Sequence, residues 1–344
     1  MADLGQASRY ATPIHQTGLS NATPGPSHTG MHLLLIDGNS LGYTSHHVGD
    51  PRYSGDRQVQ AIYNFLRSLH YKLTEDPRLF PIVVWDGRSE FRYALHPEYK
   101  SSRNKTEAQR AARKVYTAQV PSLQKLLKHL GVLQIRAPFA EADDLGYQIS
   151  RLFRGSLHHI ELYTGDTDWL QLVAENVTFR TVRRSGERVT LETFSEKTGY
   201  ASPIQFIEGK ALKGDDSDDI EGVPGVGDVT AASILTQYGT MADFYLRASA
   251  DPSILTRKVL KQIANPINQR LWERNITLMD LSRAPRVTYR DLQIAPGSLN
   301  GAAVARWCND LDFRYYVRNP DVLSYPFEQV PDHKQKVLEL LKTL

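Results

Sequence analysis

MHLLLID, residues 31–37, is a continuous apolar run that ends in an aspartate. A short run without polar alternation is typical of a β-strand that is buried on both faces of a sheet. Segments with apolar residues at helical spacing occur at 59–73, 122–131 and 142–154. Around them the strand pattern returns in FPIVVWDG (80–87), VLQIRA (132–137), HIELYTGD (159–166) and VTFRTVRR (177–184). This alternation predicts an α/β fold with a mostly parallel central sheet and helices on both faces.

The chain outside this alternation divides into two further regions. Residues 1–30 are rich in Ser, Thr, Gly, Pro and Gln and show no hydrophobic period, so we predict a disordered leader there. The α/β region spans 31–203. After residue 203 the strand pattern fades, and helical segments at 229–239, 267–281 and 334–344 predict a helical C-terminal region over 204–344.

The composition is that of an ordinary globular protein, since 41% of the 344 residues are hydrophobic and 23% are charged. A net charge of +3 is compatible with a nucleic-acid partner without establishing one. The single cysteine, Cys308, excludes an intrachain disulfide and favours a reducing compartment. No apolar run approaches the roughly 18 residues of a membrane-spanning helix, and the N-terminus lacks the layout of a secretory signal. We therefore expect a cytoplasmic protein without a membrane partner.

Acidic residues follow the predicted strands. Asp37, Asp86 and Asp166 each end a strand, and ligands of an open parallel sheet bind outside the carboxyl ends of its strands. Four more acids come close behind: Glu141, Asp143, Asp144 and Asp168. Taken singly, each acid has a plainer interpretation, as a turn residue or as a favourable charge in a first helical turn. Those interpretations give no reason for four successive strands to bring acids to one edge, so the pattern favours a shared site.

These seven acids predict a divalent-metal site. Converging like charges raise one another's pKa and destabilise a fold unless cations neutralise them. Carboxyl oxygens suit hard cations, Mg²⁺ suits a site that also holds phosphate, and the chain has no His/Cys cluster at zinc spacing. Two ions about 4 Å apart are the arrangement for in-line phosphoryl displacement, in which one ion activates water and the other stabilises the leaving oxygen. The sequence therefore predicts a two-metal phosphodiesterase.

A glycine-rich segment, KGDDSDDIEGVPGVG at 213–227, lies between two predicted helices. Gly222, Gly225 and Gly227 would let backbone N–H groups approach a phosphate, and the following helix adds its positive N-terminal dipole. Such a contact positions a nucleic-acid backbone without reading its bases. The alternative is a merely tight turn. Attachment to the acids Asp215 and Asp218 favours the functional interpretation.

In these blocks the sequence resembles the flap endonuclease/5′-exonuclease family, which includes stand-alone cellular and bacteriophage nucleases and the N-terminal domain of bacterial DNA polymerase I. The matching blocks are LLLIDGNSL (33–41), VVWDG (83–87), FRYALHPEYKSSR (91–103), EADD (141–144), TGDTDWLQL (164–172) and GDDSDDIEGVPGVG (214–227). NITLMDL (275–281) and DLDF (310–313) resemble the family's later helical part. The resemblance covers about 31–317 and implies a PIN-like catalytic domain over 31–203.

The resemblance implies nine metal ligands, namely Asp37, Asp86, Glu141, Asp143, Asp144, Asp166, Asp168, Asp215 and Asp218. Of these, Asp37, Asp86, Asp166 and Asp168 are also expected to be catalytic. The family usually has Asn after its last aspartate, where this chain has Asp219, so it stays open whether Asp218 or Asp219 approaches the metal. The glycine-rich segment resembles a helix–hairpin–helix, at about 206–239, that holds duplex DNA and often a K⁺ ion. Asp228 stands where a basic residue is common, which is expected to weaken DNA contact.

A basic stretch between residues 88 and 114 contains eight Lys or Arg against three Glu. From charge alone, a solvated helix face explains it equally well. In the flap endonuclease/5′-exonuclease family, this region forms a helical arch over the active site. The 5′ single strand passes through or under that arch, which corresponds to about 88–120 here. Lys100 and Arg103 match its phosphate-steering catalytic residues and would offset charge on the scissile phosphate. Tyr99 is expected to stack on a base, and Arg92 matches a recurring basic position in the DNA-binding set.

The sequence thus predicts a Mg²⁺-dependent, structure-specific 5′ nuclease, with Mn²⁺ able to substitute. The expected partner is DNA with 5′ single-strand/duplex junctions, with RNA primers in RNA:DNA hybrids as a further substrate, and the expected oligomeric state is a monomer. The compartment is a bacterial cytoplasm, or a host cytoplasm if the gene is carried by a phage. Two alternatives are a non-catalytic DNA-junction-binding protein and a small toxin-type RNase, although the second normally lacks both arch and hairpin.

Overall fold

The strand β1 (His32–Asp37) divides its side chains between two apolar cores. Leu33 and Leu35 belong to one core, Leu34 and Ile36 belong to the other, and all four are fully buried. Successive Cβ atoms of a strand point to opposite faces, so a strand with a core on each side needs the continuous apolar run of this sequence. Each fully buried leucine contributes about 1.5–3 kcal/mol of burial free energy.

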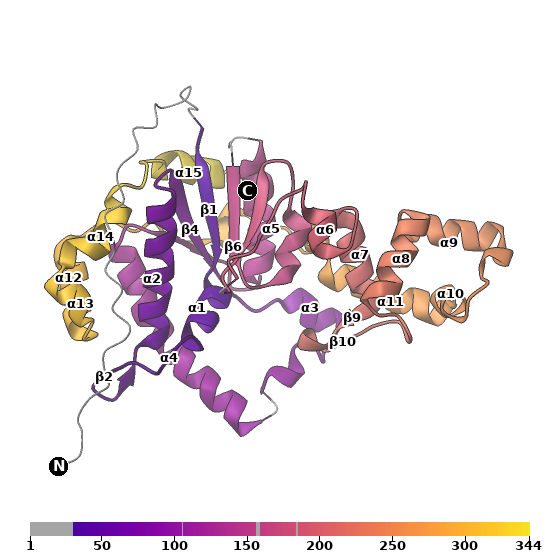
Figure 1. Ribbon diagram of the computed structural model, residues 1–344, viewed down its shortest axis with the longest axis horizontal. Helices are drawn as coiled ribbons and strands as arrows, with labels where there is room; N and C mark the ends of the chain where they lie inside the picture. Colours follow the sequence, from indigo (N-terminus) through magenta and orange to yellow (C-terminus); the bar gives the residue numbers. More distant parts are fainter. Residues whose placement is uncertain (1–29, 105, 156–158, 184) are drawn as a thin grey trace, which may run out of the picture.

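The computed structural model describes residues 30–344 except 105, 156–158 and 184. Apart from Gly30, the predicted disordered leader lies outside the described residues. Within this described part, seven strands form one sheet in the order β11-β5-β4-β1-β6-β7-β8, and Figure 1 shows β1, β4 and β6 near its centre. The strands beside β1 are β4 (Leu79–Trp85), β5 (Leu133–Arg136), β6 (His159–Thr164), β7 (Val177–Thr181), β8 (Arg188–Val189) and β11 (Gln293–Ala295).

The strand pairing confirms the predicted mostly parallel sheet. β5, β4, β1, β6 and β7 pair in parallel, while β8 and β11 add antiparallel edges. These two edge strands have two and three residues, too few to show a period in the sequence. From β1 the chain adds β4 and β5 on one side and then crosses to add β6 and β7 on the other. Ligands bind at such a reversal of strand order, outside the carboxyl ends of the strands.

Helices cover both faces of the sheet, as predicted. One face carries α1 (Gly38–His46), α2 (Gln60–Glu75), α4 (Glu107–His129), α12 (Gly301–Asp310), α13 (Arg314–Arg318) and α14 (Pro320–Glu328). The other face carries α5 (Ala142–Arg154), against which α15 (Lys334–Leu341) packs. Cys308, on α12, is buried in the first of these layers, in agreement with a structural thiol.

Two sequence predictions need correction, one on where a helix begins and one on the C-terminal region. α4 begins at Glu107 rather than at residue 122 and runs through Pro121, with a capping box between Thr106 and Gln109 at its start. The predicted C-terminal helical region, 204–344, does not stay apart from the sheet. Its strand β11 pairs with β5, and α12–α14 return to α2 and α4, on the side of the molecule opposite α8–α10 in Figure 1.

The projecting part of the C-terminal region contains the predicted hairpin. Its helices are α7 (Pro203–Lys213), α8 (Asp228–Tyr238), α9 (Met241–Ala250), α10 (Lys258–Ile263) and α11 (Pro266–Met279). α7 and α8 flank the glycine-rich segment, which also forms β9 (Gly214–Asp215), the 3₁₀ helix η3 (Asp216–Asp218) and β10 (Ile220–Glu221). In Figure 1, α9 and α10 lie farthest from the sheet.

The region predicted as an arch lies between β4 and β5. It consists of α3 (Glu90–Leu95), the 3₁₀ helix η1 (Ser101–Asn104) and the first part of α4. In Figure 1 it crosses below the edge of the sheet, from α4 to the neighbourhood of β9 and β10. The remaining described elements are β2 (Tyr53–Ser54), β3 (Arg57–Gln58), η2 (Thr167–Leu172), α6 (Phe194–Thr198), η4 (Pro252–Ile254), η5 (Leu281–Arg283) and η6 (Tyr289–Asp291). None of the described helices is long and apolar enough to cross a membrane.

A glycine next to Asp86 provides a test of how the sheet edge is built. The Gly87 N–H donates to the Ala140 carbonyl at 2.7 Å, and a Cβ on Gly87 would lie 2.0 Å from the Ala137 carbonyl oxygen. Gly87→Ala must therefore push the end of β4 away from the segment that leads into α5. We expect a loss of about 1–3 kcal/mol in the free energy of unfolding, measured by chemical denaturation.

The control is Gly155→Ala, because a Cβ on Gly155 would meet nothing within 4 Å. Its unfolding free energy should stay within about 0.5 kcal/mol of the wild type. Equal stability of the two variants would contradict the close packing around Gly87.

Candidate active site

A cavity of about 1230 Å³ opens at the carboxyl ends of β1, β4 and β6. Acidic side chains from the sheet edge, from α5, from the η3 segment and from the start of α8 line it: Asp37, Asp86, Glu141, Asp143, Asp166, Asp168, Asp215, Asp216, Asp218 and Asp228. Basic side chains line it as well: Lys100, Arg103, Arg113, Arg183, Lys210 and Lys213. The structure thus brings together eight of the nine predicted metal ligands and both predicted phosphate-steering residues.

The acids at the strand ends also accept hydrogen bonds that hold their carboxylates in place. Asp37 accepts hydrogen bonds from the Ser40 N–H and the Thr164 hydroxyl, both at 2.9 Å. Asp86 accepts from the Ala142 N–H at 2.9 Å. Asp166 accepts from the backbone N–H two residues further on, also at 2.9 Å. Asp37 and Asp166 therefore also serve as turn acids, whereas Asp86 caps the start of α5, and these bonds fix each carboxylate at the rim of the cavity.

Crowding and burial change the protonation of these carboxyls. Burial raises the pKa of Asp37 to about 7, and the charge of Asp86 adds to that rise. Burial and the neighbouring Asp168 raise the pKa of Asp166 to about 6. Desolvation by the surrounding cavity likewise raises the pKa of Asp86, and desolvation with the charge of Asp166 raises the pKa of Asp143. The cavity therefore holds carboxyls that favour a neutralising positive charge.

Three of the basic side chains that line the cavity pair with predicted metal-ligand acids. Lys100 Nζ lies 2.7 Å from Glu141 Oε1 and 3.7 Å from Asp218 Oδ2. Arg103 Nη2 lies 2.5 Å from Asp218 Oδ1. Burial acts to raise the pKa of Glu141, but Lys100 and Arg92 hold it below its usual value. Lys100 and Arg103 thus reach from η1 to acids on two other elements.

The third, Lys210 on α7, is a residue that the sequence reasoning missed. Its Nζ forms ion pairs with Asp168 and, at 2.7 Å, with Asp215. Although burial opposes it, the Lys210 ammonium lowers the pKa of Asp215 to about 2. The only signal in the sequence was a lysine in the last turns of a helix that leads into an acidic segment, and many solvated lysines share that position. Lys210 links α7 to the sheet edge through charge.

The donor set fits hard divalent cations. Its members are carboxyl oxygens that face one cavity, the ligand type that Mg²⁺ and Mn²⁺ take in proteins. Within the described residues no three His, Cys, Asp or Glu side chains already converge closely enough to hold a metal ion. Ammonium and guanidinium groups lie between the acids instead, as Lys210 does between Asp168 and Asp215. These charged side chains therefore lie between acids whose like charges repel one another.

The structure does not support Asp144 as a metal ligand or Arg92 as a DNA contact. Asp144 is 2% exposed, does not line the cavity, and accepts from the Glu141 N–H at 3.0 Å. Its two carboxyl oxygens take hydrogen bonds of 2.8 and 2.9 Å from Arg92, which is 3% exposed and also donates to the Leu278 carbonyl. The pair fixes the start of α5 and thereby positions Glu141 and Asp143. The sequence EADD alone does not show that Asp144 points toward Arg92 while Glu141 and Asp143 face the cavity.

Tyr99 does not offer a ring face for a nucleotide base. It is 3% exposed, and its hydroxyl donates to Glu141 Oε2 at 2.9 Å. One neighbour of its ring is Lys100 Nζ, 4.7 Å from the ring centre, and another is Tyr93, at 5.5 Å between ring centres. Tyr99 therefore holds Glu141 and supports Lys100, and the predicted base stacking is wrong for this conformation.

Asp218 and Asp219 have different surroundings. Asp218 lines the cavity and pairs with Lys100 and Arg103. The Asp219 carboxylate accepts from the Ser102 N–H at 2.7 Å and does not line the cavity. Asp218 is therefore the acid of this pair that faces the site.

The hairpin glycines lie outside the cavity lining. A Cβ on Gly222 would lie 1.8 Å from the Lys213 carbonyl oxygen, and Gly225 has a φ of +82°, so packing and the turn explain both. A Cβ on Gly227 would meet nothing within 4 Å. Lys213 pairs with Asp228 at 2.8 Å, which offsets the acid at the start of α8. DNA contact through Gly222, Gly225 and Gly227 stays a prediction.

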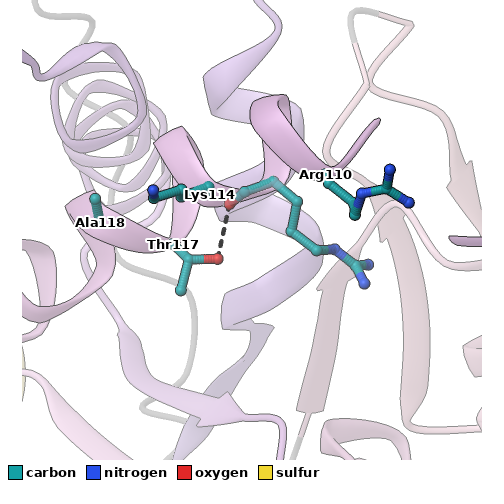
Figure 2. A pocket seen from close by; sticks show the side chains of 5 residues that line it. Arg110, Lys114, Thr117 and Ala118 are labelled. Atoms are coloured by element: carbon teal, nitrogen blue, oxygen red, sulfur yellow. Dashed lines mark hydrogen bonds between the residues drawn. The ribbon is translucent and has the colours of Figure 1, made fainter. Parts of the chain in front are cut away.

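One face of α4 presents the basic part of the arch. Arg110, Arg113, Lys114, Thr117 and Ala118 line a shallow open depression on this face, as Figure 2 shows. Residues three and four apart on a helix are neighbours, so the spacing places these side chains on one side. Arg113 and Thr117 also line the acidic cavity. The positive face of the arch is thus continuous with the site.

Comparison with protein families matches two adjoining models to this chain. Residues 32–199 match the N-terminal resolvase-like domain of 5′-3′ exonucleases, and residues 201–298 match their C-terminal SAM fold. Among curated proteins, the thermostable DNA polymerase I of Thermus filiformis is 31% identical over 66% of this chain and 26% of the polymerase. DNA polymerase I of Bacillus subtilis is 32% identical over 61% and 24%. The chain spans about a quarter of the length of these relatives.

Solved structures share the fold. The D15 protein of bacteriophage T5, co-crystallised with metal ions, gives a TM-score of 0.63 at 21% identity and covers 90% of this chain and 99% of its own. Human GEN1 in complex with Holliday junction DNA gives 0.60 at 14% identity, over 87% and 73%. Together the two family models cover most of the chain, from residue 32 to residue 298, and the chain belongs to the 5′-3′ exonuclease family.

Proposed function

We propose that this protein is a structure-specific 5′ nuclease, a flap endonuclease and 5′-3′ exonuclease that hydrolyses DNA phosphodiester bonds at 5′ ends and single-strand/duplex junctions. One observation carries the proposal. A single cavity at the sheet edge gathers eight of the predicted metal-ligand carboxylates from five separate parts of the chain and places Lys100 and Arg103 among them. A structural role alone gives no reason to bury so many like charges beside one another.

The proposed cofactor is Mg²⁺, as two ions, with Mn²⁺ able to replace it. The residues that would hold the ions are Asp37, Asp86, Glu141, Asp143, Asp166, Asp168, Asp215 and Asp218. When bound, such ions activate a water molecule and stabilise the leaving oxygen of a phosphodiester. The fixed caps of Asp37, Asp86 and Asp166 keep their carboxylates oriented without further rearrangement.

Lys100 and Arg103 are the proposed phosphate-binding residues. In this conformation each is paired with an acid of the cavity, Lys100 with Glu141 and Arg103 with Asp218. A scissile phosphate between them would exchange carboxylate oxygens for phosphate oxygens at the same nitrogens. Both side chains can then offset the negative charge that develops on the phosphate during hydrolysis.

Similar proteins support DNA as the substrate. The D15 flap endonuclease of bacteriophage T5 has been crystallised with DNA and metal ions, and the catalytic core of Rad2 with a DNA substrate. The basic face of α4, continuous with the cavity, offers this chain a path for a single strand. We further propose a monomer that takes RNA primers in RNA:DNA hybrids, binds K⁺ at the hairpin, and works in a bacterial or phage-infected cytoplasm.

The first prediction tests hydrolysis and its metal. Purified protein should cut a labelled 5′-flap DNA in Mg²⁺ and leave it intact in EDTA. Asp166→Ala and Asp168→Ala should each lower the single-turnover rate by roughly 10²–10³-fold, because each removes a carboxylate from the site. Glu175→Ala, which changes an exposed acid in the turn before β7, should cut at the wild-type rate. Binding to the junction without any cutting would indicate the non-catalytic alternative.

The second prediction concerns Lys100. Lys100→Ala should slow single-turnover cleavage by roughly 10²-fold, because the phosphate loses a charged donor. Binding of the flap in Ca²⁺, followed by fluorescence anisotropy, should stay within about threefold of the wild type, since many phosphate contacts share the affinity. Lys125→Ala, on the distant exposed part of α4, is the control and should change neither quantity. An unchanged rate in Lys100→Ala would remove Lys100 from the site.

A further inference from the structure

The base of the arch is fastened to the acidic segment that follows α7. The Lys100 N–H donates to the Asp218 carbonyl at 3.0 Å, and the Ser102 N–H donates to Asp219 Oδ2 at 2.7 Å. His96 Nε2 lies 2.8 Å from the Asp219 carbonyl oxygen. The two segments are more than one hundred residues apart in the chain, so these bonds determine how the arch sits against the C-terminal region.

The backbone at this contact has an unusual conformation. Lys100 has a φ of +57° and Asp219 a φ of +56°, and among the described residues only Asp312 is another non-glycine with a positive φ. Asp and Asn tolerate this left-handed region better than other residues, whereas a lysine rarely adopts it. Strained conformations persist when the surrounding structure over-determines them. The bonds from Asp218 and Asp219 provide that restraint.

Lys100, which has this strained backbone conformation, also places its side chain in the cavity lining. Its backbone N–H is held by the Asp218 carbonyl, and the next turn, η1, is held by the Asp219 carboxylate through Ser102. Arg103 lies in the same turn and pairs with Asp218. The direction of both basic side chains therefore depends on a bond made by a residue that does not itself line the cavity.

We propose that Asp219 is a positioning residue, which aims Lys100 and Arg103 at the site by anchoring η1 through the Ser102 N–H. A carboxylate suits the task, because a charged acceptor makes a shorter and stronger hydrogen bond to a backbone N–H than a neutral one. This role accounts for an acid at position 219 without assigning it to the metal. The effect on rate rests on the proposed nuclease function, whereas the effect on the arch does not.

Two substitutions separate the hydrogen bond from the backbone conformation. Asp219→Gly keeps the left-handed φ without strain but removes the acceptor. Asp219→Asn keeps both the tolerance of that φ and a side-chain oxygen. Glu221→Gln, on an exposed acid two residues further along, is the matched control. His96→Ala loosens the same contact from the arch side and serves as a second variant.

The first readout is independent of nuclease activity. Brief trypsin treatment of the full chain should cleave after Lys100 and Arg103 at least about fivefold faster in Asp219→Gly than in the wild type, because cleavage needs local opening. Mass spectrometry assigns the cut. His96→Ala should accelerate the same cuts, and Asp219→Asn and Glu221→Gln should not. Wild-type protection at Lys100 and Arg103 in both Asp219→Gly and His96→Ala would overturn the proposal.

The second readout is a rate cycle on flap DNA. Asp219→Gly should lower the single-turnover rate about tenfold while flap binding in Ca²⁺ stays unchanged. Asp219→Asn, which keeps a side-chain acceptor, should cut at close to the wild-type rate. In a chain that already carries Lys100→Ala and Arg103→Ala, adding Asp219→Gly should have no further effect, because the residue acts through those two side chains. An equal loss in both backgrounds would show a general structural role and overturn the positioning assignment. A wild type that does not cut would contradict the proposed function alone, since the trypsin experiment would still decide the role of Asp219.

Discussion

Like-charge crowding at one edge of the sheet is the constraint on which the other features of this structure depend. Asp37, Asp86, Asp143 and Asp166 lie close enough together around one cavity that their pKa values rise, so the fold favours positive charge at that edge. The protein brings it from two elements outside the sheet, Lys100 and Arg103 from the arch and Lys210 from α7. The same crowding that favours a divalent cation thus also ties the arch and the C-terminal region to this edge of the sheet.

The sheet topology explains why the crowding occurs at this place. Strand order reverses beside β1, so the ends of β1, β4 and β6 surround one crevice rather than three separate surfaces. Asp37 caps the turn that follows it, Asp86 caps the start of α5, and the buried Arg92–Asp144 pair fixes that start from behind. The acids cannot move apart to relieve repulsion, because their backbone positions are held by the sheet and by these caps.

The sheet and most of its acids could be predicted from the sequence, because each follows from a single physical cause that produces a recognisable pattern. The central strands β1 and β4 were predictable because burial on both faces demands an unbroken apolar run, and the acids because strand ends of a parallel sheet converge. The edge strands β8 and β11 are too short to show a period, and β11 pairs with a strand more than 150 residues away in the chain. The direction of individual side chains was also hidden: Asp143 faces the cavity while Asp144 faces Arg92, although both are acids in one helical turn. Lys210 and Asp219 owe their roles to contacts between distant segments, which local patterns do not report.

The central claim, that buried acids at the sheet edge need cations, is tested most directly by the stabilisation that Mg²⁺ produces at different pH. With folded pKa values of about 7 for Asp37 and about 6 for Asp166, both above the ordinary value for aspartate, these groups favour the folded state at low pH and lose that contribution as the pH rises through about 7. A metal must displace their protons at pH 5.5 but not at pH 8. The rise in melting temperature on adding Mg²⁺, measured by calorimetry, should therefore be larger at pH 8 than at pH 5.5. No rise at pH 8, or a larger rise at pH 5.5, would contradict the account.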